Sequence, residues 1–74
     1  MSKEFKNSEL RIKIGEKLKQ IRIKQGLSLN DISKKTKLST DTIRKIEKGI
    51  SNSRFISLSI ILIALNITFT DILK

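Results

Sequence analysis

Apolar residues along the first third of the chain follow the spacing of a helix. Between about residues 8 and 25 they step by four, four and three positions, so they share one face while the lysines lie mostly on other faces. These apolar residues are Leu10, Ile14, Leu18 and Ile21. Gly26 interrupts the pattern, and the sequence therefore predicts a first helix from about Ser8 to Gln25.

Two shorter helical patterns lie between Gly26 and Gly49, each with two apolar residues on one side. They predict helices over about Leu29–Thr36 and Thr40–Lys48, joined by a tight turn. The apolar pairs are Leu29 with Ile32 and Ile43 with Ile46. A helix, a turn and a second helix form a unit whose second helix can enter a DNA groove.

Capping residues mark the ends of these two helices. Ser28 is followed three residues later by Asp31, and Ser39 stands just before Thr40. A short hydroxyl at such a position accepts a hydrogen bond from an unpaired amide of the first helical turn. Gly49 closes the second helix, because glycine adopts a left-handed cap with the least strain.

The stretch Phe55–Leu65 reads FISLSIILIAL and predicts a fourth helix with apolar residues on two faces. One face consists of Phe55, Leu58, Ile61, Leu62 and Leu65. The opposite stripe consists of Ile56, Ile60 and Ile63, with Ile67 just beyond the helix end. A helix that is apolar on both sides needs two partners, and we expect these to be its own core and a second subunit.

A last short helix is predicted near the C-terminus. Asn66 tolerates a left-handed cap, and Thr68 with Asp71 has the spacing of a capping box. The expected dimer contact combines the second stripe with residues of this segment: Ile56, Ile60, Ile63, Ile67, Phe69 and Leu73. The apolar run is too short for a membrane span, which needs about 20 apolar residues.

Composition narrows the class of partner. The chain has 74 residues, with 16 Lys and Arg against 7 Asp and Glu, which gives a net charge of +9. Such a charge favours an anionic partner, either nucleic acid or an acidic membrane. We expect one domain over residues 8–74, preceded by a flexible basic arm over residues 1–7.

Missing residue types exclude several kinds of chemistry. The chain has no cysteine and no histidine, so it lacks a thiolate zinc site and the commonest general base. The few carboxylates are scattered, and no nucleophile with a paired base is present, so we expect neither an enzyme nor a cofactor. No ligand pocket is evident. The absence of cysteine and the charged N-terminus favour a cytoplasmic protein.

Spaced positions over about Ile14 to Leu73 resemble the phage-repressor (Xre-like, Cro-like) helix-turn-helix family. The residues that carry the resemblance are Ile14-Gly15-Glu16, Leu18, Ile21, Arg22, Gly26-Leu27-Ser28, Leu38-Ser39, Ile43, Ile46-Glu47, Gly49, Ala64-Leu65, Thr68 and Asp71-Ile72-Leu73. The resemblance implies an all-α, compact five-helix lambda-repressor-like DNA-binding domain. It also implies that Arg22 and Glu47 form a buried ion pair between the first and third helices.

The sequence departs from the family pattern at four positions. Leu29 stands where the family usually has a glutamine that binds a DNA phosphate, so this donor is lost and Asn30 is expected to replace it only in part. Lys37 replaces the glycine of the turn, so a lysine is expected at positive φ at a cost of about 1–2 kcal/mol. Ser33 replaces an alanine, and Ser53 replaces a proline before the fourth helix.

The third helix supplies the candidate DNA contacts. An inserted helix contacts bases mainly with its first turns, so we assign base contact to Thr40, Asp41, Thr42, Arg44 and Lys45. The alternative for Asp41 and Lys45 is a solvated i,i+4 ion pair worth about 0.2–0.5 kcal/mol. Backbone contacts are expected from Lys24, Ser28, Asn30, Lys48, Ser51, Asn52 and Arg54, helped by amides at helix starts.

The sequence therefore predicts a sequence-specific regulator of transcription, a repressor or autoregulator. It would bind double-stranded DNA as a homodimer, with its two third helices in successive major grooves of a near-palindromic operator. One alternative is an antitoxin-type protein that binds a partner protein through the apolar fourth helix. A membrane-surface binder is disfavoured, because the apolar and basic stretches are separate along the chain.

Overall fold

The computed structural model describes residues 7–50 and 55–73, and in these ranges all regular structure is helical. The five helices are α1 (Asn7–Lys24), α2 (Leu29–Thr36), α3 (Thr40–Lys48), α4 (Phe55–Leu65) and α5 (Phe69–Leu73). The predicted bounds of α2, α3 and α4 agree with the structure. The prediction for the arm, and those for Ser51, Asn52, Ser53 and Arg54, fall wholly or mostly outside the described residues.

The first helix begins and ends one residue earlier than predicted. It begins at Asn7, inside the segment assigned to the arm, and it ends at Lys24. Gly26 has φ 74°, which is the left-handed region that favours glycine. The amide of Leu27 donates to the carbonyl of Arg22 at 3.0 Å, so the chain has turned away from α1 by that point.

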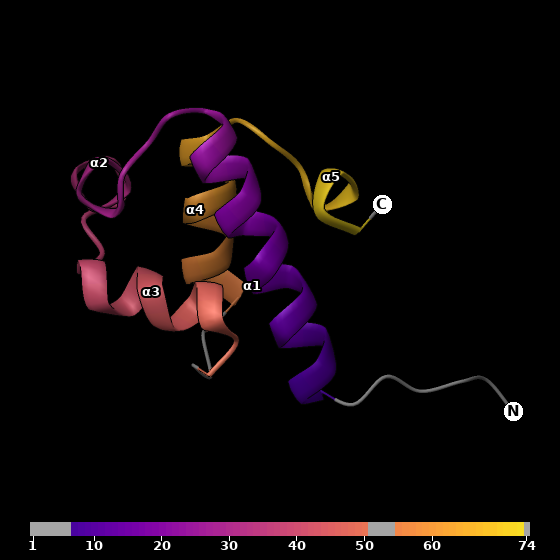
Figure 1. The fold of residues 1–74 in the computed structure, drawn as a ribbon. Helices are drawn as coiled ribbons and strands as arrows, with labels where there is room; N and C mark the ends of the chain where they lie inside the picture. The colour runs from indigo at the N-terminus through magenta and orange to yellow at the C-terminus, as the bar shows by residue number, and fades with distance from the viewer. Residues whose placement is uncertain (1–6, 51–54, 74) are drawn as a thin grey trace, which may run out of the picture.

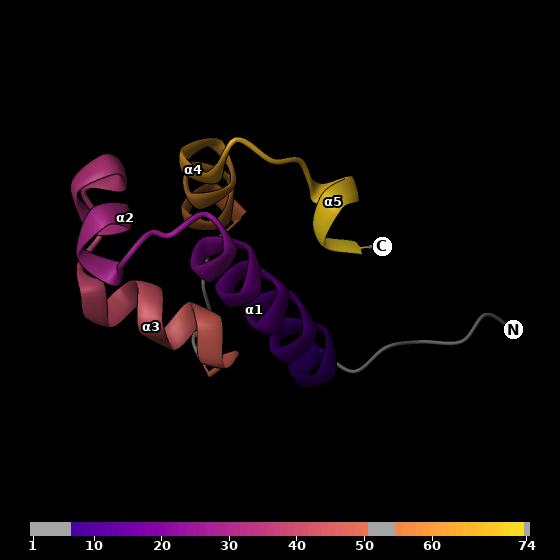
Figure 2. The same ribbon diagram turned by 45° about the horizontal axis from the view of Figure 1, so that its top comes forward.

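The helices pack with α1 and α4 in the middle of the molecule. The α2–α3 pair lies on one side of them and α5 on the other, in both views of the fold (Figures 1 and 2). All five helices contribute to one hydrophobic core. The buried residues are Leu18, Ile32, Ile43, Ile46, Ile61, Leu62, Leu65 and Ile72. Burial of these aliphatic side chains is the main force that holds the short helices together.

One hydrogen bond fixes the end of α4, whereas the start of α1 extends beyond the core. Gln25 donates from Nε2 to the carbonyl oxygen of Leu65 at 2.8 Å, which ties the end of α1 to the last turn of α4. That carbonyl belongs to the group of C-terminal carbonyls that a helix leaves without partners. At the other end, Leu10 is 38% exposed although it belongs to the apolar face, because the first turns of α1 extend past the other helices (Figure 1).

Within the described residues, left-handed residues end α2 and α4, where the sequence lacks glycine. Lys37 has φ 65° and Asn66 has φ 61°. The turn at Lys37 is held from both sides by hydroxyl groups. Ser33 Oγ donates to the carbonyl oxygen of Leu38 at 2.6 Å, and Thr36 Oγ1 accepts from the amide of Leu38 at 3.1 Å. The serine that replaces the family's alanine therefore stabilises the turn that lacks a glycine.

Candidate nucleic-acid interface

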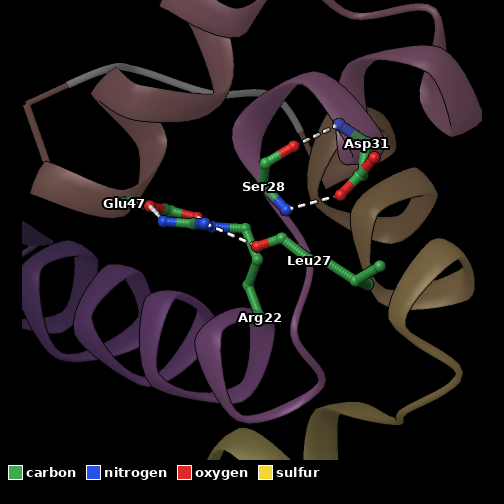
Figure 3. A network of polar contacts seen from close by, with 5 residues as sticks. All are labelled: Arg22, Leu27, Ser28, Asp31 and Glu47. Carbon is green, nitrogen blue, oxygen red and sulfur yellow. Dashed lines mark hydrogen bonds and ion pairs between the residues drawn. The ribbon is translucent and has the colours of Figure 1, made fainter.

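Caps at the start of α2 and α3 fix the geometry of the helix-turn-helix unit. Ser28 Oγ accepts from the amide of Asp31 at 3.0 Å, and the carboxylate of Asp31 accepts from the amide of Ser28 at 2.7 Å. This reciprocal pair is a capping box (Figure 3). The hydrogen bond from the Ser28 amide is the main cause that lowers the pKa of Asp31 below its ordinary value of 3.8.

Ser39 caps α3 in a similar way. Its Oγ accepts from the amide of Thr42 at 3.1 Å and donates to Thr42 Oγ1 at 2.8 Å. Gly49 ends the helix with φ 74°, and its amide donates to the carbonyl of Ile46 at 3.1 Å. Both ends of α3 are therefore determined by local interactions, as the sequence predicts.

The two sides of α3 differ in composition. Ile43, Ile46 and Glu47 are buried against the rest of the domain. Thr40 and Thr42 are half-buried at the N-terminal end, whereas the remaining side chains are exposed. The exposed side chains are Asp41, Arg44, Lys45 and Lys48. The structure thus brings all five candidate base-contact residues to one helix, with four charged side chains on its solvent side.

The acidic residue on this exposed side is paired with two cations. Asp41 Oδ1 lies 3.3 Å from Arg44 Nη2, and Asp41 Oδ2 lies 3.2 Å from Lys45 Nζ. The i,i+4 pair weighed against base contact is therefore present, and Arg44 forms a second pair that the sequence interpretation did not include. All three side chains remain about half exposed, at 49–55%, so water and anions can still reach them.

A buried ion pair joins α1 to the end of α3. Arg22 Nε donates to Glu47 Oε2 at 2.7 Å, and Arg22 Nη2 donates to Glu47 Oε1 at 3.1 Å. The two side chains are 11% and 7% exposed. Arg22 Nη1 also donates to the carbonyl oxygen of Leu27 at 2.8 Å, so one guanidinium links α1, the loop before α2, and α3 (Figure 3). The planar guanidinium group suits such a two-pronged contact with a carboxylate.

Two glycines allow α1 to approach the end of α3 closely. A Cβ atom at Gly15 would lie less than 3.0 Å from the carbonyl oxygens of Ile46 and Glu47. A Cβ atom at Gly49 would come equally close to the backbone of Ile12. Sequence reasoning used Gly15 only as part of the family resemblance. A glycine inside a helix costs about 1 kcal/mol of stability relative to alanine. The presence of Gly15 inside the helical pattern of α1 is therefore the sequence signal that indicates a packing role.

The candidate backbone contacts are only partly described. Lys24, Asn30 and Lys48 are exposed at the ends of α1, α2 and α3. Ser28 is exposed, but its amide is already paired with Asp31, so this amide is not free for a phosphate. The other three candidates, Ser51, Asn52 and Arg54, lie in the segment between the described ranges.

The candidate dimer residues divide into two groups. Ile56 and Ile63 are 69% and 77% exposed, and Ile60 is half-buried. Ile67 and Phe69 are half-buried and pack against the core of their own chain, so they are less available to a partner than the sequence suggested. The reason is that α5 folds back onto α1. The side chain of Leu73 lies outside the described residues.

Comparison with known proteins identifies the family. The helix-turn-helix family model matches residues 18–72, which include the whole α2–turn–α3 unit, α4 and most of α5. No curated protein matches the sequence. In the described part of the chain, no helix has the length and apolar character needed to cross a membrane. The five-helix fold, the capped α2–α3 unit and this match together show that the chain belongs to the Xre-like helix-turn-helix family of DNA-binding transcriptional regulators.

Proposed function

We propose that the protein is a sequence-specific repressor or autoregulator that binds a near-palindromic operator as a homodimer. The observation that supports this most directly is the exposed side of α3, where Arg44, Lys45 and Lys48 accompany Asp41. The buried side of this helix is joined to α1 by the ion pair of Glu47 with Arg22. A helix of this kind fits the major groove, and its first turns meet the base edges.

The proposed base contacts follow from the chemistry of each side chain. Arg44 and Lys45 suit the acceptors of guanine, and Asp41 suits the amino group of cytosine. Thr40 and Thr42 can contact the methyl group of thymine. Lys24, Ser28, Asn30, Lys48, Ser51, Asn52 and Arg54 are proposed to contact the sugar–phosphate backbone. Together with the net charge of +9, these contacts would make affinity fall steeply with added salt.

The ion pair of Arg22 and Glu47 is proposed to position α3 for this contact. Because the pair and Gly15 hold the last turns of α3 against α1, the helix is presented to DNA as a fixed part of the domain. Such pre-organisation reduces the conformational entropy that the protein loses when it binds DNA.

Dimerisation is proposed to use the exposed stripe of α4. Ile56 and Ile63 are the two most exposed large apolar side chains in the described part of the chain, and they lie seven residues apart on one side of α4. A second copy of this chain would cover them and would place two α3 helices about 34 Å apart, one helical turn of DNA.

Selection of bound sites from a random DNA pool, at two salt concentrations, tests the DNA-binding part of the proposal. We expect an enriched, near-palindromic motif, and Lys45→Ala should reduce the enrichment. Lys19→Ala is the matched control, because Lys19 is an exposed lysine on α1. If the pool yields no enriched motif, the protein is not a sequence-specific regulator.

Sedimentation of the chain at micromolar concentration tests the dimer. Ile63→Lys should shift the chain toward monomer, whereas Ile23→Lys, at a residue on α1 that is 57% exposed, should not. A monomer in the unmodified chain would refute the dimer. Recovery of a stoichiometric unrelated protein bound at Ile56 and Ile63 would instead support the antitoxin-type alternative.

A further inference from the structure

The carboxylate of Asp41 is shared by two cations on the surface that the proposed function assigns to DNA. One oxygen faces Arg44 at 3.3 Å and the other faces Lys45 at 3.2 Å. Asp41 is the acidic residue on the exposed side of α3, since Glu47 is buried in its pair with Arg22. The two cations nearest the expected base edges are therefore already paired in the free protein.

Folding stability does not account for this arrangement. Ion pairs between side chains that are about half exposed contribute little to stability, because water screens them and both side chains lose freedom. DNA phosphates, by contrast, compete directly for the same two cations. Contacts between phosphates and lysine or arginine supply essentially all of the non-specific affinity of a DNA-binding protein.

We propose that Asp41 is a specificity-determining residue that lowers binding to unselected DNA by holding Arg44 and Lys45 away from phosphates. The inference rests on the proposed function and deepens it. On unselected DNA, a cation that leaves Asp41 for a phosphate exposes the carboxylate to a surface of like charge. Each such contact is therefore opposed by the loss of an ion pair and by repulsion.

A matching site removes this opposition. In the major groove, a G·C pair presents guanine acceptors for Arg44 or Lys45 and a cytosine amino donor for Asp41. Where each of the two cations meets a guanine, every charged group that leaves an ion pair gains a partner on the bases. The three side chains together favour G·C pairs opposite the first turns of α3, and they disfavour sites that offer only phosphates.

Asp41→Asn tests the inference through its affinity for random-sequence duplex DNA. At 0.1 M salt we expect this affinity to rise about tenfold. One additional phosphate contact changes the logarithm of the affinity by about −0.9 times the logarithm of the salt concentration, which is about 0.9 log units at 0.1 M. The log–log salt slope should steepen by about 1, and the ratio of affinities for the selected site and random DNA should fall at least about tenfold.

Two controls separate the proposed role from a general effect of charge. Glu16→Gln makes the same change of net charge at an exposed residue of α1, and it should change affinity for random DNA less than Asp41→Asn does. In a chain that already carries Arg44→Gln and Lys45→Gln, Asp41→Asn should raise affinity for random DNA less than it does in the unmodified chain, because it releases no cation and relieves only like-charge repulsion.

Three results would overturn the inference. The first is an unchanged affinity of Asp41→Asn for random DNA. The second is a loss confined to sites that carry one particular base pair, which indicates a direct base contact alone. The third is a gain that is equally large in the chain without Arg44 and Lys45. Failure of the unmodified chain to enrich any motif counts against the proposed function, whereas an enriched motif with unchanged Asp41→Asn affinities counts against this inference alone.

Discussion

Replacement of Arg22 by methionine should destabilise the domain strongly. The change keeps a long side chain on α1 but removes three hydrogen bonds, two to Glu47 at 2.7 and 3.1 Å and one to the carbonyl of Leu27 at 2.8 Å. Glu47, whose side chain is 7% exposed, would stay buried without its partner. Removal of one member of a buried ion pair costs about 3–5 kcal/mol.

This loss is large compared with the total stability of a domain of this size. At about 0.05–0.15 kcal/mol per residue, 74 residues give a free energy of unfolding of about 4–11 kcal/mol. Arg22→Met should therefore leave a chain that is partly unfolded at room temperature or that melts far below the unmodified chain. Affinity for DNA should fall as well, because α3 loses its ion pair with α1.

Urea denaturation followed by far-ultraviolet circular dichroism measures the effect, since the chain has no Trp or Tyr to report by fluorescence. Lys19→Met is the matched control, because it removes an exposed cation from the same helix. The double replacement Arg22→Met with Glu47→Leu should recover most of the loss, since no unpaired charge remains buried. A loss below about 1 kcal/mol for Arg22→Met, with DNA affinity unchanged, would refute the reasoning.

Three further predictions concern the close contact of α1 with α3, the turn at Lys37, and the capping box of α2. Gly15→Ala should destabilise the domain by more than Gly26→Ala, for which we expect roughly 1 kcal/mol. A Cβ atom at Gly26 would meet no atom within 4 Å, so that variant suffers only from the positive φ of its backbone. Thermal melting of the two variants compares their stabilities. Lys37→Gly should stabilise by up to about 1 kcal/mol in urea, because glycine removes the strain of the left-handed conformation; a loss of stability would contradict this. Asp31 has a lowered pKa in the folded chain, so its contribution is complete above pH 3.8 and is lost as the pH falls through the folded pKa. Asp31→Asn should therefore weaken the acid dependence of stability in that window, and an unchanged pH profile of unfolding would count against the capping box.

Local chemistry allowed most of the secondary structure to be predicted. The capping box of Ser28 and Asp31, the Ser39 cap and the left-handed Gly49 involve residues at most four positions apart. Such interactions are fully specified by neighbouring residues, so the bounds of α2 and α3 could be predicted from the sequence. The Arg22–Glu47 pair joins residues 25 positions apart, and it was anticipated only through the family resemblance.

The sequence by itself determined where α2, α3 and α4 begin and end, which faces are apolar, and that the net charge of +9 favours an anionic partner. Only the tertiary structure decided which residues from distant parts of the chain contact one another. It places Gly15 against the backbone of α3, turns Ile67 and Phe69 toward their own core, and joins Arg22 to Glu47 across 25 positions of the chain. The physical reason is that helix periodicity fixes the direction of a side chain, whereas its partner depends on how distant segments pack.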